Sequence, residues 1–306
     1  MRKINNAAAS VHDKLLTLAR ERNEDFNLTL TKYGLERLLY RLSISKHRDV
    51  FVLKGALLFE LWTEQRYRPT RDADFLATGD NSPDRFAAMF NEICQTEVDV
   101  DDGCRFDATT VVAERIKEND DYEGIRVAFV GHLGTARIPI QVDIGFGDAV
   151  TPGPQEAEYP AMLDMPRPRL LAYPIETSVA EKFEAMVKLG IANSRMKDIH
   201  DLRTLLTDFD FDGITLRDAI ANTFERRKTS LPANGEMPLV FTEAFYNDDS
   251  KQKQWDSFLK KNRTYVRPEE LRSVVLAMRD FLMPVVDSVI ASAAFTKKWK
   301  AGGPWV

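Results

Sequence analysis

Three aspartates are the residues of this sequence whose types and spacing best suit chemistry. Asp72 and Asp74 are separated by one residue, so on a β-strand both carboxylates project from the same face. Asp143 lies in a second predicted strand, residues 138–144, that we expect beside the first. Three like charges on one face repel one another unless cations hold them, and carboxylate clusters suit Mg²⁺, which takes its other ligands from water and substrate phosphates. The spacing therefore predicts a magnesium site at Asp72, Asp74 and Asp143.

A second motif, upstream of the acids, suits an anion. A short run of β-branched and aromatic residues ends in Lys54-Gly55, and a strongly apolar segment, residues 56–62, follows it directly. A strand that turns into a helix at a glycine offers free backbone N–H groups, the positive end of the helix dipole and room for a phosphate. We therefore expect Lys54 and Gly55 to contact the phosphates of a nucleotide.

Each motif taken alone has a plain structural alternative. Asp-x-Asp occurs at solvated strand edges, and Lys-Gly occurs at ordinary strand-to-helix turns. In this sequence the two motifs are separated by one predicted helix and one turn. That combination favours metal-assisted phosphoryl or nucleotidyl transfer.

The elements that must position these residues follow from the periodicity of apolar residues. Three- and four-residue spacing predicts two or three helices over residues 10–42 and another over 84–93. Short apolar or alternating runs predict strands over residues 50–53, 72–76, 124–130 and 136–144, with residues 131–134 as a hairpin connection. The middle third of the chain is therefore expected to combine helices with at least four strands.

A proline-rich stretch and a helical region follow. Six prolines between residues 152 and 174 predict an extended crossing between domains that is neither helix nor central strand. Beyond them the pattern is helical almost throughout. Ser178 and Glu181 form a capping-box pattern, and Gly190 is the predicted end of that helix.

Composition narrows the classes of protein to which the chain can belong. The chain has 306 residues, 29% charged and 44% hydrophobic, which is typical of a folded globular protein of about two domains. The formal net charge is 42 − 47 = −5, so any contact with nucleic acid must come from a local basic patch. The first nine residues lack the apolar core of a signal peptide, and no apolar run approaches the roughly 18 residues of a membrane span. We therefore expect a soluble, cytoplasmic protein.

Cysteine and histidine usage excludes two further classes. The two cysteines, Cys94 and Cys104, rule out a disulfide scaffold and a cysteine-rich zinc site, and we expect both to be reduced thiols. The four histidines show no metal-ligand spacing.

Four ordered motifs resemble those of the nucleotidyltransferase AbiEii/AbiGii toxin family. The resemblance covers about residues 10–205, including the helical lead-in before residue 42. The motifs are Phe51-Val52-Leu53-Lys54-Gly55-Ala56, Arg68-Pro69-Thr70-Arg71-Asp72-Ala73-Asp74-Phe75, Glu176-Thr177-Ser178-Val179-Ala180-Glu181-Lys182-Phe183 and Arg195-Met196-Lys197-Asp198-Ile199-His200-Asp201-Leu202.

The resemblance implies a fold, a reaction and a biological setting. It implies an α/β (α+β) fold with a DNA-polymerase-β-like nucleotidyltransferase core. It implies Mg²⁺-dependent (or Mn²⁺-dependent) transfer of a nucleotide from a nucleoside triphosphate to an acceptor. In better-studied relatives the acceptor is the 3′ end of tRNA, and the proteins are toxins of bacterial toxin–antitoxin or phage-defence systems.

Carried over residue by residue, the resemblance assigns roles within the site. Asp72 and Asp74 would be the metal-binding pair, Lys182 would contact the triphosphate, and Asp198 would be the late acidic residue. The family expects a third carboxylate on a nearby strand, for which Asp143 is the candidate. Many nucleotidyltransferases have Gly-Ser at the first motif, whereas this sequence has Gly55-Ala56, so the serine hydroxyl that helps to bind phosphate is absent.

The two late motifs have physical alternatives of their own. On a helix from Ser178, Lys182 lies at the edge of an apolar face, where its ammonium either enters a cleft or stays in a solvated rim. Asp198 and Asp201 are three residues apart on the next helix, and Arg195 and Lys197 would neutralise them in a surface network. For Asp201 we expect that surface network, and for Asp198 we expect function.

Several basic clusters are candidates for contact with phosphates or RNA. Arg66, Arg68 and Arg71 lie in the loop before the aspartates, where they either balance the acids or meet the triphosphate, and Arg71 is our candidate for nucleotide binding. The C-terminal clusters are Arg226-Arg227-Lys228, Lys260-Lys261 with Arg263, and Lys297-Lys298-Trp299-Lys300. Trp299 between lysines has the composition of a base-stacking contact, although most such runs are ordinary solvated surface.

Together these observations predict three segments and one leading function. The segments are a helical N-terminal extension (1–48), a nucleotidyltransferase core with a mixed sheet (49–172) and a helical C-terminal domain (173–306). The catalytic set is Asp72, Asp74, Asp143, Lys182 and Asp198, with a nucleoside triphosphate as substrate and RNA as the expected acceptor. The expected partner is an antitoxin encoded nearby. The alternatives are a non-catalytic nucleotide- or protein-binding relative, which Ala56 favours, and a phosphotransferase on the same fold.

Overall fold

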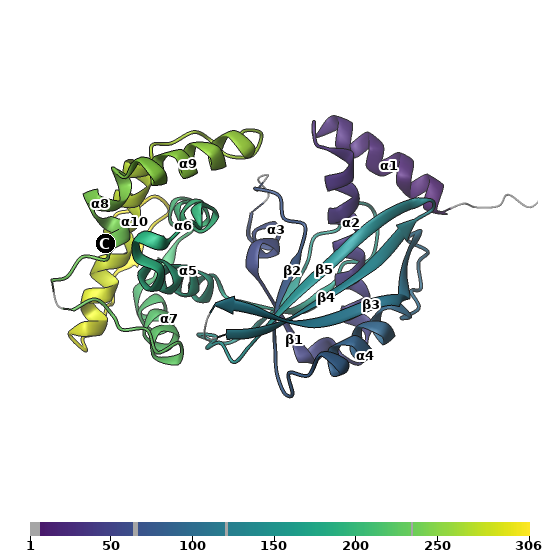
Figure 1. Cartoon of the computed structure of the whole chain (residues 1–306), viewed down its shortest axis with the longest axis horizontal. Helices are drawn as coiled ribbons and strands as arrows, with labels where there is room; N and C mark the ends of the chain where they lie inside the picture. Colours follow the sequence, from purple (N-terminus) through teal and green to yellow (C-terminus); the bar gives the residue numbers. More distant parts are fainter. Residues whose placement is uncertain (1–6, 64–66, 120–121, 234) are drawn as a thin grey trace, which may run out of the picture. The chain divides into compact units, whose positions relative to one another are not determined.

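The computed structural model describes residues 7–63, 67–119, 122–233 and 235–306. The chain forms two compact units, the first made of Met1–Gly147 with Gln155–Ala172 and the second of Asp148–Pro154 with Tyr173–Val306. In Figure 1 the first unit runs from purple to teal and the second from green to yellow.

The first unit combines helices with a seven-stranded sheet. Its elements are α1 (Ala7–Glu21), α2 (Phe26–Ile44), the 3₁₀ turn η1 (Arg48–Val50), β1 (Phe51–Lys54), the 3₁₀ turn η2 (Gly55–Leu57), α3 (Leu58–Trp62), β2 (Ala73–Ala77), α4 (Pro83–Cys94), β3 (Cys104–Asn119), β4 (Tyr122–Leu133), β5 (Ala136–Phe146), β6 (Gln155–Glu158) and β7 (Arg169–Ala172). The strand order is β3-β4-β5-β2-β1-β7-β6. The pairs β1–β7 and β2–β5 are parallel and the others antiparallel, so the predicted α/β core with a mixed sheet is confirmed.

One face of the sheet is covered by α2 and α4, which also contact each other. Phe51 of β1 packs edge-on against Phe75 of β2 and against two phenylalanines of α4. Gly34 lets α2 approach β5, since a Cβ there would lie 2.9 Å from Ile138 Cγ2. Because side chains alternate along a strand, the neighbours Asp74 and Asp143 project from the opposite face, which we call the open face.

The N-terminal helices are tied to the sheet unit. Asp25 caps α2 by accepting from the backbone N–H of Leu28 at 3.0 Å. Within α2, Arg41 forms a buried two-point ion pair with Asp102, which precedes β3, at 2.8 and 3.1 Å. Residues 7–44 therefore pack as part of the core of this unit.

The proline-rich stretch differs from its prediction. It contains β6 and β7, and β7 lies inside the sheet between β1 and β6, so the expectation that this stretch holds no central strand is wrong. The reason is that Pro168 and Pro174 flank β7, which leaves the backbone N–H groups of Arg169–Ala172 available for pairing. The long strand β3 was also not predicted.

The second unit is helical almost throughout, as predicted. Its elements are α5 (Ile175–Leu189), the 3₁₀ turn η3 (Gly190–Ala192), α6 (Met196–Asp208), β8 (Phe211–Asp212), α7 (Gly213–Arg226), the 3₁₀ turn η4 (Leu239–Phe241), α8 (Glu243–Tyr246), α9 (Asp249–Lys261), α10 (Leu271–Ile290) and β9 (Lys298–Trp299). The small strands β8 and β9 pair with each other.

Helix α5 begins earlier than its prediction. It starts at Ile175 after Pro174, so Ser178 lies inside the helix and the predicted capping box is wrong. Proline suits the position before a helix because it needs no hydrogen-bonded N–H. The predicted end is confirmed, since Gly190 caps the helix with φ +51°.

Two further findings concern the cysteines and membranes. Cys94 and Cys104 are both buried free thiols, as predicted. Within the described part of the chain, every helix is too short or too polar to cross a bilayer.

Candidate active site

Strand register brings the predicted residues of the first unit together. Lys54 at the end of β1 pairs with Asp74 of β2, and Asp74 pairs with Asp143 of β5. The two carboxylates therefore lie on adjacent strands of the open face, although 69 positions separate them in the sequence. This gathering depends on β2 being inserted between β1 and β5 in the sheet.

Gly55 is the residue that makes room for Asp74. Its φ is +76°, and a Cβ on it would lie 2.0 Å from Asp74 Oδ2. No larger residue fits there without displacing the carboxylate, so the glycine serves the aspartate directly. The predicted helix behind it is short, a 3₁₀ turn followed by the five residues of α3, and its dipole is correspondingly weak.

Asp72 lies immediately before β2 and is half-buried. Its carboxylate accepts a hydrogen bond from the hydroxyl of Thr70. It also lies close enough to Arg126 of β4 for its charge to contribute to that residue's raised pKa. Asp72 thus faces the same part of the open face as the other two acids.

Arg126 is a site residue that the sequence prediction missed. Its Nε donates to Asp143 Oδ1 at 2.8 Å and its Nη2 to Asp143 Oδ2 at 2.7 Å. Gln141 adds longer contacts of 3.4 and 3.3 Å to the same two oxygens. Both oxygens of Asp143 are therefore engaged by a guanidinium, and the residue is only 8% exposed.

The donor set fits a divalent cation at Asp72 and Asp74 rather than at all three acids. In the described ranges, no group of three or more His, Cys, Asp or Glu side chains is gathered closely enough to hold a metal ion. Two carboxylates plus phosphate oxygens form the kind of ligand set that Mg²⁺ accepts, because it retains waters and binds substrate phosphates. The predicted metal-ligand role of Asp143 requires that Arg126 first release it.

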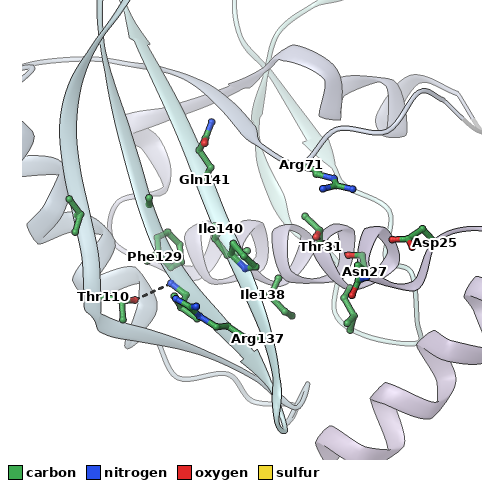
Figure 2. A pocket seen from close by; sticks show the side chains of 15 residues that line it. Asp25, Asn27, Thr31, Arg71, Thr110, Phe129, Arg137, Ile138, Ile140 and Gln141 are labelled. Atoms are coloured by element: carbon green, nitrogen blue, oxygen red, sulfur yellow. Dashed lines mark hydrogen bonds between the residues drawn. The ribbon is translucent and has the colours of Figure 1, made fainter. Parts of the chain in front are cut away.

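A groove adjoins the acids on the first unit. It has a volume of about 930 Å³ and is lined by the first half of β5, the neighbouring parts of β3 and β4, the start of α2 and the loop before β2. It exists because β2 pairs only with Val142–Phe146 of β5, leaving residues 136–141 without a strand on that side. Figure 2 shows Arg71, Arg137 and Gln141 around it, and the amide of Gln141 reaches Asp143.

Two of the three arginines in the loop before the aspartates lie in the part of the chain that the structure describes. Arg71 is exposed and lines the groove. Arg68 lies over the ring of Tyr67, 5.5 Å from its centroid, and that ring stacks on Phe59. Arg66 lies outside the described residues.

Lys182 and Asp198 lie together in the second unit. Lys182 of α5 donates to Asp198 Oδ1 at 2.9 Å and to Asp201 Oδ2 at 2.7 Å. Arg195 also donates to Asp198. The network joins α5 to α6, and the side chains of Asp198 and Asp201 are 3% and 0% exposed.

The protonation of Asp198 reflects this network. Burial by itself would raise the pKa of the carboxyl, but the charges of Lys182 and Arg195 outweigh it and hold the pKa below its usual value. The prediction of a surface network at Asp201 is wrong, because that side chain is fully buried and accepts a hydrogen bond from Lys182. Lys197, in contrast, is exposed.

Two of the candidate RNA contacts are structural. Arg227, whose side chain is 17% exposed, pairs with Asp148, Glu181 and Glu184 at 3.0, 3.2 and 2.9 Å. Trp299 is 5% exposed and donates from Nε1 to the carbonyl of Leu206 at 2.6 Å. Trp299 is therefore too buried for base stacking, and Arg227 is held by acids of the second unit.

Comparison with known proteins gives a family match. Residues 37–281 match the family described as nucleotidyl transferase AbiEii toxin, type IV toxin–antitoxin system. A Helicobacter pylori chain described as a candidate nucleotidyltransferase is similar, with 12% identity, a TM-score of 0.48, and coverage of 87% of this chain and 97% of that one. JHP933 from Helicobacter pylori is similar with 14% identity, a TM-score of 0.46 and the same coverages, 87% and 97%. No curated protein matches the chain.

Proposed function

Since the chain belongs to the AbiEii nucleotidyl transferase toxin family and is a nucleotidyltransferase, we propose that it moves a nucleoside monophosphate from a nucleoside triphosphate to an RNA acceptor. The expected acceptor is the 3′ end of tRNA, and pyrophosphate leaves. The observation that carries this proposal is the fit of Asp74 against Gly55, beside Asp143 on the open face. A glycine that leaves room for one carboxylate is expected where that carboxylate must reach a substrate.

The proposed metal site consists of Asp72 and Asp74. When bound there, Mg²⁺ or Mn²⁺ would neutralise negative charge on the phosphates and favour deprotonation of the attacking hydroxyl. The chain's own contribution is to fix the two carboxylates, Asp72 through the hydroxyl of Thr70 and Asp74 through its place in β2 beside Gly55. Asp143 is the proposed third acid of the site.

Lys54, Arg71 and Lys182 are the proposed cationic contacts of the triphosphate. Ammonium and guanidinium groups form charge-assisted hydrogen bonds to phosphate oxygens. With Ala56 at the position where many relatives of this fold have serine, the backbone N–H groups near Gly55 and the ammonium of Lys54 must supply the donors. Asp198 supports Lys182 through their 2.9 Å contact.

The groove beside β5 is the proposed path of the acceptor. Its exposed arginines, Arg71 and Arg137, suit a phosphate backbone, and Gln141 connects it to the acids. Its volume of about 930 Å³ lies within the range of ligand-binding clefts.

The biological setting follows from the family. Type IV toxin–antitoxin membership implies an antitoxin partner, which we propose is encoded nearby. We further propose a role in phage defence, with the reaction taking place in the cytoplasm, where nucleoside triphosphates and RNA are found.

Incorporation of labelled nucleotide tests the proposal. Each of the four labelled nucleoside triphosphates is incubated with the protein, total RNA and Mg²⁺, and RNA-bound label is counted. Label is expected with wild type, and not with EDTA or with D72A or D74A that still fold. D99A, which removes an exposed carboxylate elsewhere on the first unit, is the matched control and is expected to keep full activity.

Mass spectrometry of the modified RNA separates the proposal from phosphoryl transfer. A mass gain of a nucleoside monophosphate supports nucleotidyl transfer, whereas a gain of a single phosphate contradicts it. Binding of all four triphosphates without any incorporation would also contradict it.

A further inference from the structure

We propose that Asp143 acts through Arg126: the carboxylate holds the guanidinium on the open face, where the guanidinium binds phosphoryl oxygens of the substrate. The inference rests on the proposed nucleotidyl transfer. It makes Arg126 a substrate-binding residue and Asp143 a positioning residue rather than a metal ligand.

The pairing of the two residues is built into the sheet. Arg126 of β4 and Asp143 of β5 are register partners in an antiparallel ladder. Their two parallel hydrogen bonds of 2.8 and 2.7 Å form the planar fork in which Arg and carboxylate match best. A fork of this kind fixes the plane of the guanidinium as well as its position.

The rest of the guanidinium is available to a ligand. An arginine side chain has five N–H donors, and the bonds to Asp143 use one on Nε and one on Nη2. Across the described residues, no other acceptor takes a hydrogen bond from Arg126, and its side chain is 37% exposed. Three donors therefore point away from Asp143 on a surface that also carries Asp72 and Asp74.

The charges around Arg126 favour this role over a metal at Asp143. A hydrogen bond from Arg126 to Asp143, together with the charges of Asp143, Asp72 and Glu114, raises the pKa of Arg126, so the group stays cationic. A metal ion on the oxygens of Asp143 would sit against that fixed cation and be repelled. A phosphate, in contrast, is attracted by it and matches its fork geometry.

The phosphoryl oxygens have two possible sources, the incoming triphosphate and the phosphodiester of the acceptor. Inorganic tripolyphosphate represents the first without a base. A pool of single-stranded RNA tetranucleotides represents the second. Binding of each is measured by calorimetry in EDTA, so that no metal contributes.

The variants are R126Q, R126K and D143N, with R105Q as the control. R126Q is expected to weaken one of the two probes by about tenfold, the value of one charged hydrogen bond. D143N is expected to weaken the same probe less, because the guanidinium remains but loses its fixed plane. R126K should restore part of the affinity for that same probe through charge alone. R105Q removes an exposed arginine of β3 in the same sheet and is expected to leave the binding of both probes unchanged.

A Mn²⁺ titration followed by electron paramagnetic resonance tests the alternative, in which Asp143 is a metal ligand. If D143N loses Mn²⁺ affinity while R126Q gains it, Asp143 is a metal ligand and Arg126 only a placeholder, which overturns the inference. Unchanged binding of both phosphate probes by R126Q also overturns it. Thermal unfolding checks that each variant is folded. If D143N does not fold, the test rests on R126Q and R126K, because Arg126 is partly exposed.

Failure of this inference is distinguishable from failure of the proposed function. Nucleotide incorporation by wild type, with phosphate binding unchanged in R126Q, removes the inference alone. Loss of phosphate binding in R126Q without incorporation by wild type removes the proposed function and leaves a phosphate site at Arg126.

Discussion

At the scale of single residues, the clearest relation in the molecule is between a missing side chain and a carboxylate. Gly55 has no Cβ, and the space is taken by the carboxylate of Asp74. The position of the Asp74 carboxylate therefore depends on a residue that contributes no functional group.

Replacing Gly55 by alanine is expected to remove activity more than stability. The new Cβ would meet Asp74 Oδ2 at 2.0 Å and push the carboxylate aside. Displacement of a catalytic group by about 1 Å costs on the order of 100-fold in rate. Nucleotide incorporation and thermal unfolding of G55A measure the two effects.

Gly190 provides the matched control for this substitution. It has φ +51°, and no atom lies within 4 Å of the place that a Cβ would occupy, so G190A introduces only backbone strain of about 1–3 kcal/mol. Equal losses of activity in G55A and G190A would contradict the role assigned to Gly55.

The two cysteines are expected to be inert in the folded protein. Burial raises the pKa of the thiols of Cys94 and Cys104 to about 12. Because the thiolate is the nucleophile, iodoacetamide at about pH 8 should modify neither residue in the native state and both in guanidinium chloride. Mass spectrometry after timed alkylation counts the modified thiols, and rapid labelling of the native protein would contradict the prediction.

At the scale of elements, strand register decides which residues meet. The connection between β4 and β5 is a two-residue turn, Gly134-Thr135, and this turn length pairs Arg126 with Asp143. The predicted hairpin connection at residues 131–134 is therefore too long, since residues 131–133 belong to β4. Had the strands ended at residue 130 and resumed at 136, Asp143 would face a different residue. A one-residue slip also moves a side chain to the other face of the sheet.

Helices α5 and α6 are joined by Lys182, Asp198 and Asp201, and this network should make stability depend on pH. The pKa of Asp198 is lowered in the folded state, so its contribution is present above the unfolded pKa, about 3.8, and is lost as the pH falls through the folded value. We expect D198N to lose roughly 3 kcal/mol at pH 7 and to show a shallower fall in stability below about pH 4.

Chemical denaturation at a series of pH values measures this effect. D208N removes an exposed carboxylate of the same helix and is the control. A D198N curve parallel to wild type below about pH 4 would show that the carboxyl is not perturbed.

At the scale of the whole molecule, the net charge of −5 confines any RNA contact to local basic surface. The groove beside β5 carries two exposed arginines, Arg71 and Arg137, on the unit that holds the acids. The C-terminal clusters offer less free basic surface than their composition indicated, because Trp299 is buried, Arg227 pairs with Glu184 and Lys300 pairs with Asp210 at 2.6 Å.

Reversing both groove charges is expected to weaken binding of the proposed RNA acceptor specifically. R71E with R137E should reduce RNA binding, and the slope of the logarithm of affinity against the logarithm of salt should fall by about 1 for each phosphate that the arginines no longer neutralise. Filter binding at several salt concentrations measures this slope. K260E with K261E, at the exposed end of α9, is the matched charge reversal and is expected to leave the slope unchanged.

Much of the fold and part of the site followed from local pattern. The helices over residues 10–42, the strands that carry Lys54, Asp74 and Asp143, and the helical second unit were all predictable, because apolar periodicity and turn residues act over a few positions. Motif spacing likewise singled out the aspartates and Lys182.

What local pattern left open was burial and pairing between distant segments. Three contacts join separate elements: Arg126 with Asp143, Lys182 with Asp201, and Arg227 with its acids. A charged residue has the same local sequence pattern whether it is solvated or buried in an ion pair. Such pairs form only after strand order and helix packing bring desolvated charges together, so their partners are chosen by the folded chain as a whole.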